Sequence, residues 1–504
     1  MEQNVEVHSR NQIKVATLVS YISIAVNIIS GLLFTPWLIH QLGDGDYGIY
    51  SIGTSIITLL IMDFGISEAV AKYVAQYRTE GKEEKVTELL SLVTKIYLIL
   101  ALIFLALFSV LYFFLGNIYA GLTAGELIKL KNVYIIIAIY NVFAFAFTPL
   151  SGIMLAYEHL VSLKLCDIVL RLLTIVITII AIINGLGLYS AVMANAIAGV
   201  AVIAYKLYII QSNHRFKIDL SYQDNDLLKK IFSFSIWVAL LVITQRCIYS
   251  ITPSILGALS SSNEVTLYSV SSALEGYAYS FGSVISTLFL AKITRQLEAG
   301  DYDGFNKLIQ FLLCAVILGG FICVGNDFIN LWMGNGYEIT YTMTVILLIP
   351  SVFIWPFMTA SVGLTVANRD KGPALVNLGT ACINIFMECI LVGKLGALGA
   401  VLSIAIANSF KGIALIFVYK KYLPIRLHQF IKEVFVIYGV PLGMITVFGV
   451  CLLKFVPLGG TVGFLIKGIA IVILYTITIL MVIRLGDHAF YDFIKGYVGK
   501  RKTE

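Results

Sequence analysis

Charged residues are scarce in this chain. Asp, Glu, Lys and Arg together make up 13% of the 504 residues, whereas 59% are hydrophobic. Soluble proteins average about 25% charged and about 45–50% apolar residues, so the composition indicates an integral membrane protein. The net charge of +6 is spread over many short segments. It does not form the basic patch that nucleic-acid binding needs, and we expect no nucleic-acid partner.

Long polar segments and enzyme motifs are also lacking. No polar stretch between apolar runs exceeds roughly 25 residues, which is short of the usual minimum of about 50 for a soluble domain. The six His are scattered without HxxxH or HExxH spacing, and there is no GxxxxGK[ST] loop. The seven Cys lie in or beside apolar runs without a CxxC pair, as small packing residues do. We therefore expect no catalytic residues, no metal, no cofactor and no intrinsic ATP hydrolysis.

Apolar runs of eighteen or more residues recur along the whole chain, each long enough to cross a hydrocarbon core of roughly 30 Å. Backbone groups in lipid must be satisfied within the segment, and the alternation over about ten residues typical of barrel strands is absent. The fold class is therefore an all-α polytopic membrane protein. Hydropathy gives about fourteen spans. They are 15–39, 49–74, 91–115, 132–156, 164–184, 188–210, 231–257, 265–290, 306–325, 341–366, 374–393, 398–419, 433–455 and 462–484.

The distribution of Lys and Arg predicts the topology. These residues concentrate in one alternating set of loops, such as 78–85 and 206–230. The positive-inside rule places those loops and both termini in the cytoplasm. The apolar run 15–39 is longer than the core of a signal peptide, so we expect no cleaved leader.

An internal repeat accompanies the spans. Four short matches recur in the same order: Thr35-Pro36 with Thr252-Pro253, Gly152–His159 with Gly363–Asp370, Leu186-Gly187 with Leu395-Gly396, and Tyr205-Lys206 with Tyr419-Lys420. Six helices per unit preserve orientation, which predicts two parallel six-helix bundles with substrate handled between them. The predicted parts are a cytoplasmic segment 1–14, a first bundle 15–210, a cytoplasmic linker 211–230, a second bundle 231–422, two C-terminal helices at 433–484, and a basic cytoplasmic tail 485–504.

Ionisable side chains inside the spans are the candidate functional residues, because a charge in hydrocarbon is costly unless it faces a bundle interior or water. The cations suit an anionic group that crosses a water-filled path, and they are Lys72, Arg171, Arg246 and Lys411. The acids are candidates for ion coupling or ion pairing, and they are Asp63, Glu68, Asp167, Glu275 and Glu388.

Structural alternatives stay open for these residues. The i,i+4 spacing lets Glu68 pair with Lys72 and Asp167 with Arg171, and long cations near the cytoplasmic surface can snorkel. Arg246 lies too deep for that, roughly 20 Å from the cytoplasmic end of its span, and Glu275 is its expected partner. The Gly-Asp-rich turn 43–48 is read as turn chemistry rather than as a metal site.

Two stretches carry a family resemblance: FTPWLIHQLGDGDYGIY at 34–50 and DFGISEAVAKY at 63–73. Together with the helix arrangement, they resemble the bacterial polysaccharide flippases of the multidrug/oligosaccharidyl-lipid/polysaccharide exporter superfamily. The resemblance implies that a polyprenyl-pyrophosphate-linked oligosaccharide crosses the bacterial cytoplasmic (inner) membrane by alternating access. O-antigen, lipopolysaccharide and exopolysaccharide repeat units are such substrates.

The same resemblance implies roles and partners. The deep cations would attend the pyrophosphate and acidic sugars, whereas Asp63, Glu275 and Glu388 would serve as proton (H+) or sodium (Na+) sites. Membrane lipids, glycosyltransferases and a glycan polymerase of the same pathway would be partners.

Three alternatives remain. A multidrug exporter and a lipid II flippase of the same superfamily share this architecture. A membrane glycan polymerase or ligase is the alternative from another class, but the longest external segments, 116–131 and 326–340, are short for a catalytic domain.

Overall fold

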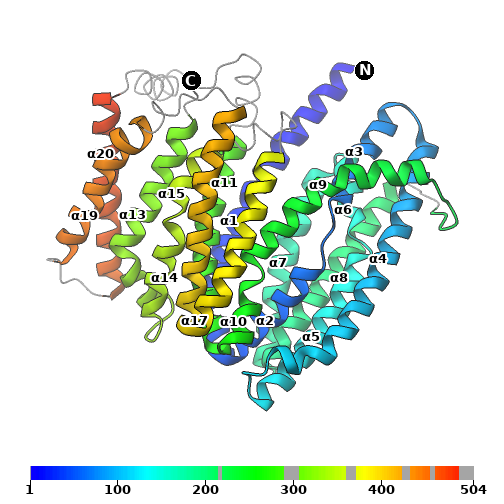
Figure 1. Ribbon diagram of the computed structural model, residues 1–504. Helices are drawn as coiled ribbons and strands as arrows, with labels where there is room; N and C mark the ends of the chain where they lie inside the picture. The colour runs from blue at the N-terminus through cyan, green and yellow to red at the C-terminus, as the bar shows by residue number, and fades with distance from the viewer. Residues whose placement is uncertain are drawn as a thin grey trace. The chain divides into compact units, whose positions relative to one another are not determined.

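The computed structural model describes residues 2–213, 218–288, 306–358, 371–422, 432–454 and 460–486. Every regular element among these residues is a helix (Figure 1). The elements are α1 (Glu2–Leu42), α2 (Asp44–Leu60), α3 (Ile66–Thr79), α4 (Glu83–Ile118), α5 (Ala124–Phe145), α6 (Pro149–Ala156), α7 (Leu160–Ile183), α8 (Leu188–Asn213), α9 (Asn225–Tyr249), α10 (Thr252–Leu259), α11 (Ser262–Leu288), α13 (Asn306–Trp332), α14 (Glu338–Leu348), α15 (Ser351–Ile354), η1 (Trp355–Phe357), α17 (Lys371–Tyr422), η2 (Lys432–Gly439), α19 (Val440–Lys454) and α20 (Gly460–Gly486).

The all-helical membrane fold predicted from the sequence is confirmed. Within the described residues, ten helical segments are long and apolar enough to cross a membrane. This count is below the predicted fourteen because 49–74, 265–290 and 433–455 do not qualify as long apolar helices, and because α17 joins two predicted spans. The exact number of spans and the side of the termini stay predictions. The predicted tail 485–504 lies, after Gly486, outside the described residues.

Several predicted spans are interrupted helices. Breaks separate α2 from α3 at 61–65, α5 from α6 at 146–148, α9 from α10 at 250–251, and α14 from α15 at 349–350. Pro149, Pro253 and Pro350 stand at or beside the start of the second segment. The first helical turn has no intrahelical use for the N–H that proline lacks. Pro36, by contrast, lies inside continuous α1, so the matched Thr-Pro pairs of the repeat differ in local structure. The repeat partner Gly363–Asp370 lies outside the described residues.

The Gly-Asp-rich turn forms the start of α2. Gly43 is its N-cap with φ 81°, and Asp44 and Asp46 lie in the first turn, where negative charge suits the positive end of the helix. Asp46 also pairs with Lys129 of α5 at 2.5 Å. Asp46 thus links the start of α2 to α5.

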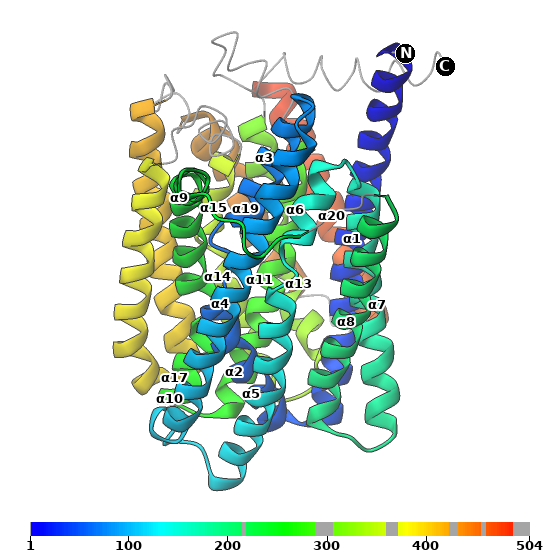
Figure 2. The same cartoon turned by 90° about the vertical axis from the view of Figure 1, so that its right-hand side faces the viewer.

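The chain divides into two compact units. Unit 1 comprises Met1–Ser269 and Glu388–Ala397, and unit 2 comprises Val270–Met387 and Leu398–Glu504. In unit 1, α7 packs beside α8 and α1, α3 beside α6, and α2 beside α5 and α10 (Figure 2). An aromatic cluster braces its interior, with the Phe104 ring 5.0 Å from Phe145 and 6.3 Å from Phe108 between centroids.

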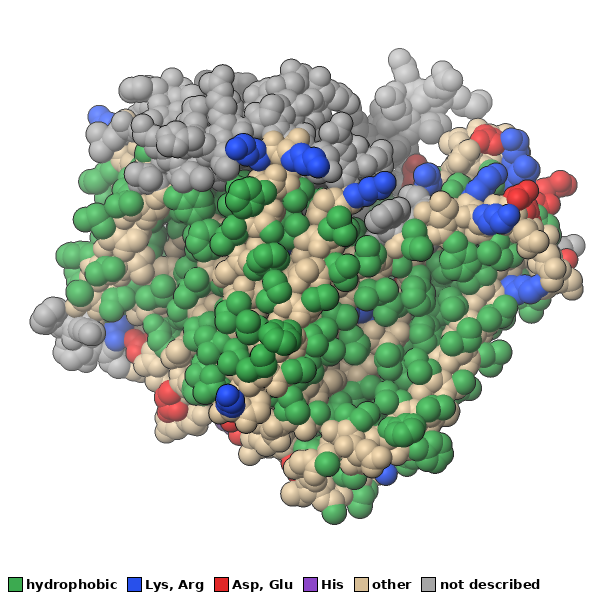
Figure 3. Space-filling view, viewed as in Figure 1, with side chains coloured by type: hydrophobic (Ala, Val, Ile, Leu, Met, Phe, Trp, Pro, Cys, Tyr) green, Lys and Arg blue, Asp and Glu red, His purple; other side chains and the backbone are tan. Residues whose placement is uncertain are grey.

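Unit 2 is built around α13, which packs against α14, α19 and α20. A buried cluster in this unit combines residues of α13, η1, α17, η2, α19 and α20, including Phe311, Phe357, Tyr419 and Tyr475. On the face shown in Figure 3, hydrophobic side chains cover the middle of the helices, and charged side chains gather toward helix ends. This distribution suits helices that face lipid.

Candidate functional site

A polar cavity of about 490 Å³ lies among α1, α2, α7 and α8 of unit 1. Such a cavity is unusual among membrane helices, where apolar packing is the rule. Its lining combines hydroxyl, amide and charged side chains with a few aliphatic ones: Ser23, Ile24, Val26, Asn27, Tyr50, Asp167, Ile168, Leu170, Arg171, Thr174 and Asn195.

Arg171 supplies the positive charge of this cavity. Its Nε donates a hydrogen bond to Ser30 Oγ at 3.2 Å, and Ser30 Oγ donates to the Asn27 carbonyl at 3.2 Å. A guanidinium carries five N–H donors. Among the described residues this is the hydrogen bond that the structure assigns to Arg171, so α1 orients the group and most of its donors remain for a ligand.

Asp167 lies one helical turn before Arg171 and also lines the cavity. Its carboxylate pairs with Lys164 Nζ at 3.4 Å, and both side chains are more than 40% exposed. Helical spacing allows Asp167 to pair with Lys164 at i,i+3 or with Arg171 at i,i+4, and the structure has the pair with Lys164. An exposed ion pair of this kind is weak. Arg171 therefore keeps its charge available in the cavity.

A second polar cluster surrounds the break between α2 and α3. Arg246 of α9 donates from Nη1 to the Ile61 carbonyl at 2.8 Å. Asp63 accepts hydrogen bonds from Tyr97 Oη and from the Ser67 amide, the latter at 3.2 Å. The sequence analysis placed Asp63 among the ion sites and Arg246 among the substrate ligands. The structure brings both to one helix break, where each contacts groups that the break leaves free.

Glu388 of α17 is fully buried in unit 1. Its Oε1 accepts a hydrogen bond from Thr252 Oγ1 at 2.5 Å, at the first residue of α10. A buried carboxylate needs such partners. In unit 2, Glu275 of α11 interacts electrostatically with Lys411 of α17. Because Arg246 and Glu275 belong to different units, the pairing predicted for them stays a prediction.

The two remaining candidates lie on the surface of α3. Glu68 and Lys72 are both exposed, and Lys72 Nζ lies 5.7 Å from the centroid of the Tyr73 ring. Neither lines the polar cavity. Within the described chain, no group of three or more His, Cys, Asp or Glu is placed to hold a metal ion.

Comparison with known proteins identifies the family. A model described as "Polysaccharide biosynthesis protein" matches residues 15–289, which is more than half of the chain. The chain belongs to the polysaccharide biosynthesis protein family. The family predicted from the stretches 34–50 and 63–73 is thereby confirmed, since both lie inside the matched region.

Solved structures show the fold of this family member. The chain is similar to the lipid II flippase MurJ in an inward closed conformation, with a TM-score of 0.70, 15% identity, and 93% of this chain and 98% of that chain covered. It is also similar to an inward-facing multidrug resistance MATE family transporter of the MOP superfamily, with a TM-score of 0.60, 14% identity, and 84% and 99% covered. The eukaryotic MATE transporter AtDTX14 matches with a TM-score of 0.57, 15% identity, and 84% and 99% covered. No curated protein sequence matches the chain. The fold is thus that of transporters, not of enzymes.

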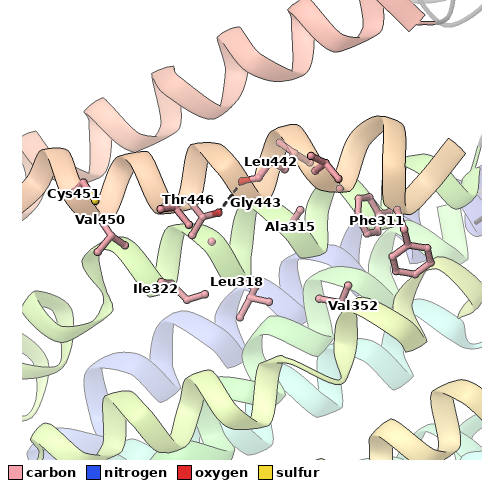
Figure 4. Close-up of a pocket in the computed structure, with 15 residues that line it drawn as sticks. Phe311, Ala315, Leu318, Ile322, Val352, Leu442, Gly443, Thr446, Val450 and Cys451 are labelled. Atoms are coloured by element: carbon pink, nitrogen blue, oxygen red, sulfur yellow. Dashed lines mark hydrogen bonds between the residues drawn. The ribbon is translucent and has the colours of Figure 1, made fainter. Parts of the chain in front are cut away.

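Unit 2 of this polysaccharide biosynthesis protein holds an apolar cavity of about 630 Å³. Aliphatic and aromatic side chains from α13, α15, η2 and α19 line it, among them Phe311, Leu318, Val352, Leu442 and Val450 (Figure 4). Thr446 contributes a hydroxyl, which donates to the Leu442 carbonyl at 2.8 Å. The lining offers a long hydrocarbon chain a favourable environment.

The sequence analysis missed the uncharged part of the polar cavity. Ser23, Asn27 and Ser30 follow one another at i, i+4 and i+7 on α1, and the same spacing relates Asp167, Arg171 and Thr174 on α7. Residues at this spacing share one face of a helix. This shared polar face was the signal that could have predicted the cavity wall.

Proposed function

We propose that the protein is a flippase that moves a polyprenyl-pyrophosphate-linked oligosaccharide repeat unit from the cytoplasmic to the outer leaflet of the bacterial inner membrane. The observation that carries the proposal is the polar cavity of unit 1 with Arg171 on its wall. A cation held in place by Ser30 inside otherwise apolar helices is suited to an anionic, hydrogen-bonding cargo.

The chemistry of such a substrate matches both cavities. A pyrophosphate accepts paired hydrogen bonds from a guanidinium, and sugar hydroxyls bond to side chains such as Asn27, Asp167 and Asn195. Taken by itself, the apolar cavity of unit 2 has the kind of lining that a polyprenyl chain would need. Arg246, Lys411 and Lys72 remain proposed contacts of the anionic group during the cycle.

Energy input would come from an ion gradient. Asp63, Glu275 and Glu388 are the proposed coupling carboxylates, because an acid inside the membrane can exchange H+ or Na+ when its surroundings change. Alternating access would expose the polar cavity first to the cytoplasm and then to the outer side. Glycosyltransferases and a glycan polymerase of the same pathway would make and use the lipid-linked repeat.

Replacing Arg171 tests the proposal. In cells lacking the protein we expect lipid-linked repeat to accumulate on the cytoplasmic leaflet and surface O-antigen or exopolysaccharide to fall. Wild type should restore surface glycan, whereas Arg171→Ala should lower it about tenfold or more, which corresponds to a charged hydrogen bond of about 1.5–3 kcal/mol. Arg171→Lys keeps the charge and should recover part of it. Arg484→Ala, at the exposed end of α20, is the matched control.

The outcomes also separate the alternatives. Full surface glycan with Arg171→Ala at normal protein level would remove Arg171 from the site. Loss of cell-wall precursor export instead of glycan export would indicate a lipid II substrate. Sensitivity to organic cations with normal glycan would indicate a drug exporter.

A further inference from the structure

In unit 1, each of two interrupted helices donates a side-chain hydrogen bond to the backbone at the other's break. One break lies between α2 and α3, and the other between α9 and α10. Each interruption leaves carbonyls at the end of the first segment and amides at the start of the second without helical partners. Inside a membrane such groups must find partners within the protein.

The first break receives its carbonyl partner from α9. Ile61 is the C-cap of α2, and its carbonyl oxygen accepts a hydrogen bond from Arg246 Nη1 at 2.8 Å. Arg246 itself lies in the last turn of α9. Its positive charge therefore stands beside the negative ends of two helix dipoles, α2 and α9, where a cation is favourable.

The second break receives its carbonyl partner from α2. Ser250 is the C-cap of α9, and its carbonyl oxygen accepts a hydrogen bond from Ser55 Oγ of α2. The same hydroxyl lies 2.8 Å from Ser254 Oγ in α10. Ser55 therefore contacts both sides of the α9–α10 break, just as Arg246 of α9 contacts the end of α2.

Carboxylates complete the arrangement at the starts of the second segments. Asp63 accepts from the Ser67 amide in the first turn of α3, and Glu388 accepts from the Thr252 hydroxyl at the first residue of α10. Acids favour the positive end of a helix. The α2–α3 break thus has a donor from α9 and an acid that accepts from an amide of α3. At the α9–α10 break the donor is Ser55, and Glu388 binds the Thr252 side chain.

We propose that the two breaks form one coupled hinge in which Arg246 and Ser55 are positioning residues. Neither helix pair can bend or straighten at its break without losing the hydrogen bond that the other helix supplies, so the two breaks change together. The bend of α2–α3 is a strained one, because Phe64 adopts φ 53°, a left-handed conformation that is uncommon for a bulky residue. In this structure Arg246 bonds to the backbone of α2. The use of this hinge in transport rests on the proposed function, but the coupling itself does not.

Thiol labelling of the full-length protein in membranes measures the coupling directly. The background lacks the seven natural cysteines, and one reporter cysteine is placed at each break, Met62→Cys or Ile251→Cys. Labelling rates with a membrane-permeable maleimide are then compared in four pairs of proteins. Two variants are tested against wild type, Arg246→Met and Ser55→Ala. Two exposed controls, Arg484→Met and Ser109→Ala, are compared with wild type in the same way.

The decisive readout is the effect at the break that the substituted side chain does not contact. Ser55→Ala should change labelling at the Met62→Cys reporter about fivefold, the change expected from a neutral hydrogen bond, although Ser55 bonds to the α9–α10 break. Arg246→Met should change labelling at the Ile251→Cys reporter by about tenfold or more, as expected for a charged bond. Arg246→Lys and Ser55→Thr keep a donor and should restore rates toward wild type, and the controls should leave both reporters unchanged.

Purely local effects would overturn the proposal. If each variant altered labelling only at the break that it contacts, or at neither break, the two breaks would not be coupled. If Arg246→Met failed to fold, the milder Ser55→Ala and its Ser55→Thr rescue would still decide. Labelling needs no substrate, so coupled breaks in a protein that moves no lipid-linked saccharide would refute the proposed function alone.

Discussion

Gly48 allows α2 to approach the start of α11 closely, and replacing it is the sharpest structural test. A Cβ atom built on Gly48 would lie 2.7 Å from the carbonyl carbon of Ser262 and 3.0 Å from its Cα, and would overlap its carbonyl oxygen. These are backbone atoms, which cannot rotate away as a side chain can. Gly45, three residues earlier on the same helix, has its nearest neighbours at 3.6 Å, an ordinary contact.

The contrast gives opposite expectations for two chemically identical changes. Overpacking typically destabilises by about 1–3 kcal/mol, and a backbone clash belongs at the upper end. Gly→Ala inside a helix returns about 1 kcal/mol through helix propensity. We therefore expect Gly48→Ala to lower the free energy of unfolding by about 2 kcal/mol, whereas Gly45→Ala should be neutral or slightly stabilising.

Thermal unfolding of the purified protein measures this difference. By the scaling of soluble domains, about 2–4 °C per kcal/mol, Gly48→Ala should lower the melting temperature by about 4–8 °C relative to wild type. Gly45→Ala in the same preparation is the control. Equal melting temperatures for the two variants would refute the close packing of α2 against the start of α11.

Three further changes have defined outcomes. Thr252→Val removes the hydroxyl that donates to buried Glu388 and should destabilise by about 1–3 kcal/mol, the cost of an unsatisfied buried acceptor, with Thr252→Ser as the rescue in the same melting assay. Lys467 and Asp327, paired at 2.7 Å, should show a coupling of about 0–1 kcal/mol in a double-mutant cycle, and the coupling should weaken in high salt. Hydrogen bonds from two amides of the first turn of α9 lower the pKa of Asp224 below its ordinary 3.8. Its contribution to stability is therefore present above that ordinary pKa and lost as pH falls through the lower folded value. Asp224→Asn should still cap the helix, but the melting temperature should lose this pH dependence. If the variant and wild type showed the same pH profile of melting temperature, the cap would be contradicted.

The helical class was predictable because apolar runs of this length have few alternatives in a membrane. The prolines Pro253 and Pro350 allowed kinks to be expected at two of the breaks. The breaks after α2 and α5 were not predicted, since hydropathy is averaged over a window of about 19 residues and a short break inside an apolar run disappears from the average. The run 49–74 illustrates this, because Ile61 and Met62 of its break are themselves apolar. The signal was present in Asp63-Phe64-Gly65, where an acid and a glycine precede a new helix. Gly65 indeed takes the left-handed conformation, with φ 72°.

The candidate site was predictable only in its charged members. Arg171 was identified because an intramembrane cation needs an explanation, and the structure places it on a polar cavity. Its hydroxyl and amide neighbours were missed, because such residues are common in membrane helices and serve packing as often as binding. Spacing left the pairing of Asp167 with Arg171 open, and the structure pairs Asp167 with Lys164, which the sequence analysis did not consider. The tertiary arrangement of α1 and α7, which hydropathy does not contain, decides which polar faces meet.

Arg246 shows that a partly buried cation can be paired with a backbone carbonyl. Its depth in the membrane demands a partner, and the sequence offers Glu275 on the next helix. The structure supplies the Ile61 carbonyl as a partner, at the residue where α2 ends, while the pairing with Glu275 stays a prediction. The cation and the interruption satisfy each other: without the break no backbone acceptor would be free, and without Arg246 the carbonyl would lack a donor. In an apolar sequence, a lone Arg therefore indicates an interrupted neighbouring helix as much as a carboxylate partner. A short acid–glycine sequence such as Asp63-Phe64-Gly65 helps to identify which helix is interrupted.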